Sequence, residues 1–217
     1  TRDRENLEKK ANFSNGERKL NSHKSTVKDA IILNDSTIIS ISFDSTIKLT
    51  KLNTGEIIQL RKSSKYWGLT ASTEFVIAAN SSNQLEFFTI QNGGETAAYS
   101  HTKDLNFQNQ SITAIKYFHA KNLLIIGTSR GALYLYDILQ SKFIFKDLKS
   151  HNSLITSISQ KEDLVLTTSY DTKVILWNFN EVSKYKWQKI FHSHKDQVYA
   201  ASFIGENSVL SIGKRGG

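Results

Sequence analysis

Residues 150–178 read SHNSLITSISQKEDLVLTTSYDTKVILWN and contain three short apolar runs separated by polar turns. The runs occupy residues 154–158, 164–169 and 174–177, and the turns lie at residues 160–163 and at Tyr170 and Asp171. Short runs with apolar residues at alternate positions, bounded by turn residues, are typical of β-strands. The stretch therefore predicts three antiparallel strands in a meander.

The same pattern recurs along the chain. Residues 22–49 and 193–217 share its Ser-His opening, residues 111–137 repeat the strands without the histidine, and residues 67–90 form the most degenerate copy. The tight turns fall at Asp44, Ser82, Arg130, Asp171 and Arg215. Apolar runs that could form a fourth strand occupy residues 56–60, 96–99, 143–148 and 187–191. A period of about 40 residues fits a repeated four-stranded unit.

The ends of these units resemble those of a known family. Ser22-His23, Ser150-His151, the turn aspartates and the closing pairs Trp177-Asn178 and Tyr136-Asp137 resemble the Gly-His and Trp-Asp ends of WD40-repeat β-propellers. The resemblance covers residues 11–217 and implies an all-β fold, a β-propeller of four-stranded antiparallel blades. It implies about five blades, at approximately residues 22–60, 65–99, 110–148, 150–191 and 193–217, with the first and last incomplete. Residues 1–10 are expected to form a charged linker or loop.

The resemblance also implies a structural hydrogen-bond network inside the blades. In the family, a loop histidine, a strand hydroxyl, a turn aspartate and a strand tryptophan form a buried chain, which here would be His151, Thr167, Asp171 and Trp177. The earlier copy supplies His23, Ser40 and Asp44 but has Thr50 at the tryptophan position, and His194 occupies the histidine position of the last copy. Buried polar groups require partners, so such a network is expected to stabilise each blade.

Other chemistries for these residues are less well supported. A histidine, a hydroxyl and an aspartate also occur in nucleophilic catalysis, but a set repeated in successive units is typical of structure, so we expect no catalytic residue. His192 and His194 lack nearby further ligands for a metal. Gly213-Lys214 lacks the first glycine and the Ser or Thr of a phosphate loop. No cofactor is expected, and the sequons at Asn12, Asn34, Asn80 and Asn109 are attributed to an Asn/Ser-rich composition.

Composition favours a soluble, basic domain. The 217 residues are 39% hydrophobic and carry a formal charge of +8, which favours acidic partners. With no cysteine, the chain holds no disulfide or thiolate site, and an intracellular location, cytoplasm or nucleus, is expected. No apolar run approaches the roughly 20 residues of a transmembrane segment.

The candidate partner-binding face lies where the family places the histidine loops and the aspartate turns. It comprises exposed basic residues and aromatic anchors, namely Lys24, Tyr66, Trp67, Arg130, Tyr170, Lys195, Lys214 and Arg215. Trp67 could equally fill a core layer, and turn cations could simply be solvated. Basic groups at turns suit an acidic or phosphorylated peptide.

Function follows from the resemblance. It implies a non-catalytic protein-protein interaction scaffold, the WD-repeat domain of a larger intracellular protein or complex, whose missing blades come from the rest of the chain or from a partner. The alternative is a basic propeller surface that binds nucleic acid, anionic lipid or a phosphorylated ligand.

Overall fold

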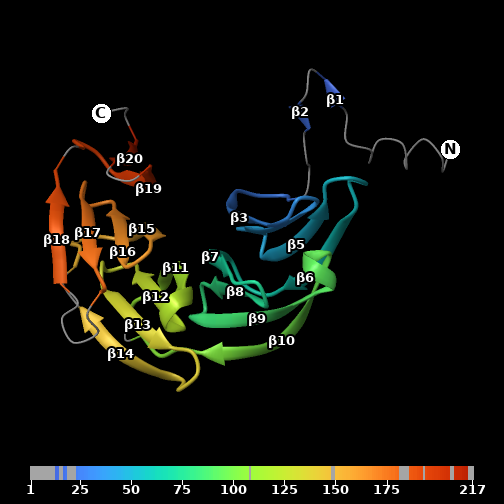
Figure 1. Cartoon of the computed structure of the whole chain (residues 1–217), viewed down its shortest axis with the longest axis horizontal. Helices are drawn as coiled ribbons and strands as arrows, with labels where there is room; N and C mark the ends of the chain where they lie inside the picture. The colour runs from blue at the N-terminus through green and yellow to red at the C-terminus, as the bar shows by residue number, and fades with distance from the viewer. Residues whose placement is uncertain are drawn as a thin grey trace. The chain divides into compact units, whose positions relative to one another are not determined.

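A computed structural model describes residues 13–14, 17–18, 23–107, 109–147, 150–180, 186–192, 194–205 and 208–214. The chain folds as two compact units. Unit 1 comprises residues 1–80 and 84–103, and unit 2 comprises residues 81–83 and 104–217. Both are built from antiparallel β-sheets in which strands follow one another in sequence order (Figure 1).

Unit 1 contains two four-stranded meanders. The first joins β3 (Val27–Asn34), β4 (Thr37–Ser42), β5 (Thr46–Lys51) and β6 (Ile57–Lys62). The second joins β7 (Tyr66–Ala71), β8 (Phe75–Asn80), β9 (Gln84–Gln91) and β10 (Thr96–Asp104). A separate hairpin pairs β1 (Phe13–Ser14) with β2 (Glu17–Arg18). The expectation that the first blade is incomplete is wrong, because β3 and β6 complete its sheet.

Unit 2 contains two further four-stranded meanders and a two-stranded sheet. The strands are β11 (Ile112–Phe118), β12 (Leu123–Thr128), β13 (Leu133–Asp137) and β14 (Lys142–Asp147), then β15 (Ile155–Lys161), β16 (Leu164–Ser169), β17 (Val174–Asn178) and β18 (Lys186–Phe191). The last sheet pairs β19 (Val198–Ile204) with β20 (Ser208–Gly213). Two short 3-10 turns, Asn92–Gly94 and His119–Lys121, complete the secondary structure of the described residues.

The sheets inside each unit pack through their first strands. β3 lies against β7 in unit 1, while β15 lies between β11 and β19 in unit 2. The apolar side chains between neighbouring sheets form the core, for example Ile41 and Val76 in unit 1 and Leu133 and Ile155 in unit 2. Burial of such side chains contributes roughly 1.5–3 kcal/mol each. Blades stacked in this way are the building principle of a β-propeller.

Each first strand contains a β-bulge at its second residue. The register shifts there by one position, and the bulge residues are Lys28, Trp67, Thr113, Thr156 and Tyr199. A bulge leaves its residue unpaired and redirects the side chain. The bulge is therefore a repeated structural feature that the alternating pattern alone does not predict.

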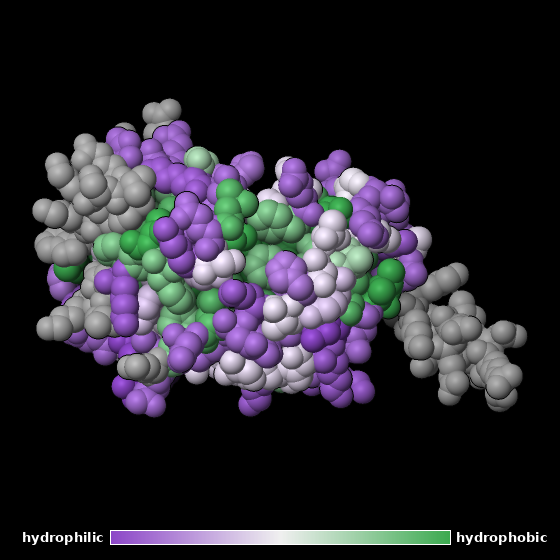
Figure 2. Space-filling model, turned by 90° about the horizontal axis from the view of Figure 1, so that it is seen from below, coloured by the Kyte–Doolittle hydropathy of each residue, from purple (hydrophilic) through white to green (hydrophobic). Residues whose placement is uncertain are grey.

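The surface combines polar and apolar residues. Figure 2 shows hydrophilic residues spread over the face drawn there, with hydrophobic residues reaching the surface between them. Ile32, Leu139 and Leu210 are among the exposed large hydrophobic residues. Across the described residues, no helix is long and apolar enough to cross a membrane.

Candidate functional site

The fourth sheet, β15–β18, contains a continuous polar network. His151 Nδ1 lies 3.0 Å from Asp171 Oδ2, and His151 Nε2 lies 2.8 Å from Thr167 Oγ1. Trp177 Nε1 donates to the same Thr167 oxygen at 2.9 Å. Because an indole N–H only donates, the Thr167 proton is free for Nε2 of a neutral His151, which leaves the Nδ1 proton facing Asp171. The contacts run from Asp171 through His151 and Thr167 to Trp177, and these are the four residues that the resemblance implies.

The hydrogen bonds around Asp171 set its charge state. Burial acts to raise the pKa of Asp171, but hydrogen bonds from His151 and from the backbone N–H groups of Asn152 and Lys173 outweigh it and lower the pKa to about 2. Asp171 is therefore a carboxylate at neutral pH. Its role is to orient His151 and to hold the turn that precedes β17.

The first sheet contains a shorter version of the network. His23 lies 3.0 Å from Asp44 through Nδ1 and 2.8 Å from Ser40 through Nε2. Burial acts to raise the pKa of Asp44, yet hydrogen bonds from Thr46, the Lys24 backbone and His23 hold it well below its usual range. Thr50 is buried at the position of the tryptophan. The chain of contacts therefore stops at Ser40.

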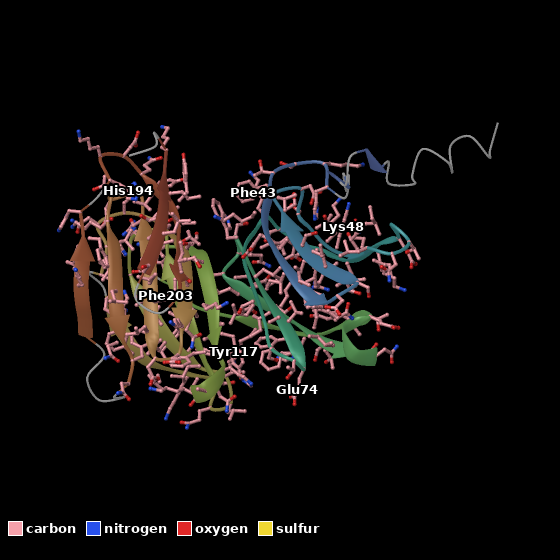
Figure 3. The ribbon with its side chains drawn as sticks, turned by 45° about the horizontal axis from the view of Figure 1, so that its top comes forward. Phe43, Lys48, Glu74, Tyr117, His194 and Phe203 are labelled. Carbon is pink, nitrogen blue, oxygen red and sulfur yellow. The ribbon has the colours of Figure 1, made fainter. Side chains whose placement is uncertain are left out.

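The last sheet contains one link of the network. His194 Nε2 lies 2.6 Å from Ser211 Oγ. Arg215, at the aspartate position, lies outside the described residues. In Figure 3, His194 lies at one end of the strands of unit 2 and Tyr117 lies at the opposite end.

The second sheet contains a different polar cluster, which sequence reasoning missed. Glu86 is fully buried on β9 and accepts hydrogen bonds from Tyr66 Oη at 2.7 Å and Asn80 Nδ2 at 3.1 Å. Arg61 Nε lies 2.9 Å from Glu86 Oε2, although its N–H is not directed at that oxygen. The signal in the sequence was a lone acid inside the apolar run QLEFF. A buried carboxylate needs such partners to remain charged.

These contacts leave no open nucleophile in the network. Thr167 is fully buried, and its oxygen already contacts both His151 and Trp177. A substrate therefore has no access to that oxygen. Among the described residues, no group of three or more His, Asp or Glu side chains is arranged to hold a metal.

In unit 1, the candidate face separates into surface and core residues. Lys24 is exposed, but Tyr66 is fully buried and donates to Glu86, so the expectation that Tyr66 is a surface anchor is wrong. Trp67 is half-buried, its ring centroid lies 4.7 Å from that of Phe43, and Lys28 Nζ lies 5.8 Å from the ring. Burial lowers the pKa of Lys28. Trp67 is thus held mainly by neighbours within the unit.

In unit 2, four of the candidate residues lie exposed at one end of the strands. This end, the turn end, carries the β12–β13 and β16–β17 turns. Arg130 lies in the β12–β13 turn, Tyr170 lies in the β16–β17 turn, and Lys195 and Lys214 flank the β19–β20 sheet. The Lys214 N–H donates to the Gln197 carbonyl, which brings the two lysine-bearing segments together. Arg215 cannot be placed with them, because it is outside the described residues.

The turn of Arg130 is held against the neighbouring sheet. The His151 N–H donates to the Gly131 carbonyl at 3.0 Å, and Gly131 has a φ of +81°. A Cβ at Gly131 would lie 2.1 Å from the His151 carbonyl oxygen, so only glycine fits there. The exposed arginine is therefore presented by a rigid turn.

A pocket of about 500 Å³ opens beside Arg130. Its lining includes the aromatic side chains Phe107, Tyr134 and Phe143 and the cations Arg130 and Lys146. Phe107 and Tyr134 are buried and form the inner wall, while Phe143 is 39% exposed. The pattern of turns in the sequence indicates Arg130 but not the aromatic residues around it.

The comparisons with known proteins agree with this geometry. The family model described as "WD domain, G-beta repeat" matches residues 142–178, from β14 through β17. The crystal structure of the WD40 β-propeller domain of Doa1 superposes with a TM-score of 0.70 at 16% identity, over 89% of this chain and 64% of that one. The computationally designed Ika8 protein gives a TM-score of 0.69 at 21% identity, over 89% of this chain and 57% of that one. A search of curated proteins found no match.

The matched repeat places one WD40 repeat at residues 142–178, and the fold shared with the solved structures is that of a β-propeller. Its residues span less than two thirds of the length of either solved structure. The match begins in the outer strand of one sheet and ends in the third strand of the next, so the sequence repeat is offset from the blade. The matched repeat therefore spans the junction between the third and the fourth sheet.

Proposed function

We propose that this chain is a non-catalytic interaction scaffold within a larger assembly, and that it binds protein partners at the turn end of unit 2. WD40 propellers generally act as protein-interaction scaffolds. The observation that carries the proposal is that unit 2 has one set of residues engaged in internal hydrogen bonds and another set exposed to solvent. The histidine, threonine and aspartate of the network are engaged in hydrogen bonds, whereas Arg130, Tyr170 and Lys195 are exposed.

Two links make the turn end of unit 2 a continuous surface. The Gly131 carbonyl accepts from the His151 N–H, and the ring of Tyr170 lies 6.0 Å from that of Tyr199 on β19, in an edge-to-face pair. Neighbouring sheets therefore present their turns side by side. A partner seated there meets exposed aromatic rings and cations together, a combination enriched in binding hot spots.

The two-stranded sheet suggests a second kind of partner. Among the described residues, β20 pairs only with β19, and Leu210 and Ile212 on β20 are exposed. We propose that further strands, from the rest of the protein or from a partner chain, pair with this edge. An unpaired apolar edge strand otherwise favours aggregation.

The test is recovery of partners with the full-length protein from its own cells. The double variant Arg130→Asp, Lys195→Asp is compared with Lys142→Asp, Lys189→Asp, which reverses two exposed charges on outer strands. We expect the first variant to lose proteins that the wild type and the second variant both retain, with all three melting at the same temperature. Identical recovery with both variants would contradict the proposal.

The alternative is a basic surface that binds nucleic acid or anionic lipid, favoured by the net charge of +8. Labelled single-stranded RNA and phosphatidylserine vesicles are the probes. Binding that falls steeply as salt rises would support this alternative, because neutralised phosphates release counterions. Partner proteins that remain bound at high salt would support the scaffold.

A further inference from the structure

The pocket beside Arg130 combines an aromatic wall with positive charge. Phe107 lies 4.9 Å from Tyr134 and 5.5 Å from Phe143 between ring centroids, and Tyr134 lies 5.5 Å from Phe143. All three ring pairs are steeply tilted, with interplanar angles from 57° to 72°. Rings in contact at such angles form an uneven apolar wall, which suits an aromatic side chain packed edge-to-face better than a flat base between parallel faces.

The charges of the pocket are of one sign. Arg130 and Lys146 line it, and none of the described residues that line it is acidic. Lys146 Nζ lies 5.5 Å from the Tyr134 ring centroid, which holds this cation over the aromatic wall. The Arg130 side chain has no hydrogen-bond or ion-pair partner in the part of the chain that the structure describes. A ligand that complements this pocket therefore carries an apolar group for the aromatic wall and an anionic group for the two cations.

The polar floor of the pocket is ordered in advance. Gln110 Nε2 donates to Tyr134 Oη at 2.7 Å, and Gln110 Oε1 lies 2.8 Å from Thr128 Oγ1. The Tyr134 hydroxyl is thus occupied as an acceptor, and its proton is available for an acceptor on a ligand. Groups held in place before binding cost less entropy when a ligand arrives.

We propose that this pocket binds a short peptide segment in which an aromatic side chain is flanked by carboxylate or phosphate groups. The aromatic side chain packs against Phe107, Tyr134 and Phe143 where they line the pocket, and the flanking anions pair with Arg130 and Lys146. A volume of about 500 Å³ is within the range of specific ligand pockets. The inference rests on the proposed scaffold function and names the partner chemistry for one part of its surface.

The experiment titrates blocked tripeptides into the isotopically labelled 217-residue chain and follows the amide signals of Gln110 and Gly131 by NMR. The probes are Asp-Phe-Asp, its phosphoserine counterpart, Lys-Phe-Lys, Asp-Ala-Asp and inorganic phosphate. We expect the first two to bind about tenfold more tightly than the others, because only they carry both the ring and the anions. Which of the two binds better separates a carboxylate from a phosphate partner.

Matched variants test the location. Phe143→Ala is compared with Ile144→Ala, since Phe143 and Ile144 are neighbours on β14 with exposures of 39% and 37%. Arg130→Ala and Lys146→Ala are compared with Lys142→Ala on the same strand as Lys146. We expect each pocket variant to bind Asp-Phe-Asp several-fold more weakly than the wild type. The control variants should bind it with unchanged affinity.

Equal affinity for all probes, or equal loss in the control variants, would overturn the proposal. Arg130 lies on an exposed turn, so its variant is expected to fold even if Phe143→Ala does not. If partner recovery by the full-length protein survives Arg130→Ala and Phe143→Ala, the pocket assignment fails while the scaffold function stands. Failure of the scaffold function would instead appear as no partner at all.

Discussion

Thr156 Oγ1 donates a hydrogen bond of 2.8 Å to the carbonyl oxygen of Val198, which lies 42 residues further along the chain. Thr113 Oγ1 makes the equivalent bond of 2.7 Å to the carbonyl of Ile155, also 42 residues away. Both threonines occupy the bulge of a first strand, and both acceptors belong to the first strand of the next sheet. The bulge thus directs a side chain from one blade onto the backbone of its neighbour.

Replacement of Thr156 by valine tests this link between blades. The Thr156→Val variant keeps the shape but removes the donor, which leaves the Val198 carbonyl without that partner. We expect a loss of about 1–2 kcal/mol in the free energy of unfolding, measured by urea denaturation. Ser202→Ala, at an exposed position on β19, is the control and should change little. An equal effect of the two substitutions would contradict the link.

Replacement of Thr167 by valine tests the blade network. The Thr167→Val variant leaves both His151 Nε2 and Trp177 Nε1 buried without their partner. We expect a loss of about 3 kcal/mol, since each unsatisfied buried group costs about 1–3 kcal/mol. Ser40→Ala affects only His23 and should cost less. The interpretation fails if the Ser40 variant is destabilised as much as the Thr167 variant.

The lowered pKa of Asp171 predicts an acid-sensitive stability. The pKa of the Asp171 carboxyl falls from an ordinary value of 3.8 to about 2 in the folded chain, so the unfolded chain binds the proton more readily. The stabilisation is present above pH 4 and is lost as the pH falls from about 4 through 2. Melting temperatures measured from pH 6 to pH 2 should fall less steeply for Asp171→Asn than for the wild type. Asp35→Asn, on an exposed turn, should leave the slope unaltered.

Removal of the hydroxyl group should have different effects on stability at two buried tyrosines. Tyr66 Oη donates to the buried Glu86, whereas the buried Tyr136 Oη has no hydrogen-bond partner among the described residues. Tyr66→Phe should therefore lower the free energy of unfolding by about 1.5–3 kcal/mol, as expected for a hydrogen bond to a charged group. Tyr136→Phe should leave stability unchanged or raise it slightly. Thermal unfolding of the two variants measures the difference. An equal loss of stability in both would contradict the prediction.

Much of the fold was predictable because the signals are local. Alternating apolar residues and the turn at Tyr170 and Asp171 predict β16 and β17 within one residue, whereas β15 runs three residues beyond its expected end at Ile158. The resemblance to WD40 repeats, and not the spacing by itself, implies that His151, Thr167, Asp171 and Trp177 belong to one network. A period near 40 residues then implies stacked sheets.

The candidate binding site was only partly predictable. Arg130 was recognised from its turn, but Phe107, Tyr134 and Phe143 come from a loop and two strands whose sequences look like ordinary core. Their convergence depends on how the segment before β11 lies against β13 and β14. No pattern within one strand carries that information.

The sequence alone determined the strands and their order, because period-2 alternation and turn chemistry act between near neighbours. The residues of the blade network followed from the resemblance to WD40 repeats. Only the tertiary structure decided that Tyr66 faces Glu86 and that Thr156 reaches Val198. The physical reason is the bulge at the start of each first strand. A shift of one residue in register exchanges the two faces of a strand, so the direction of these side chains depends on pairing across the sheet.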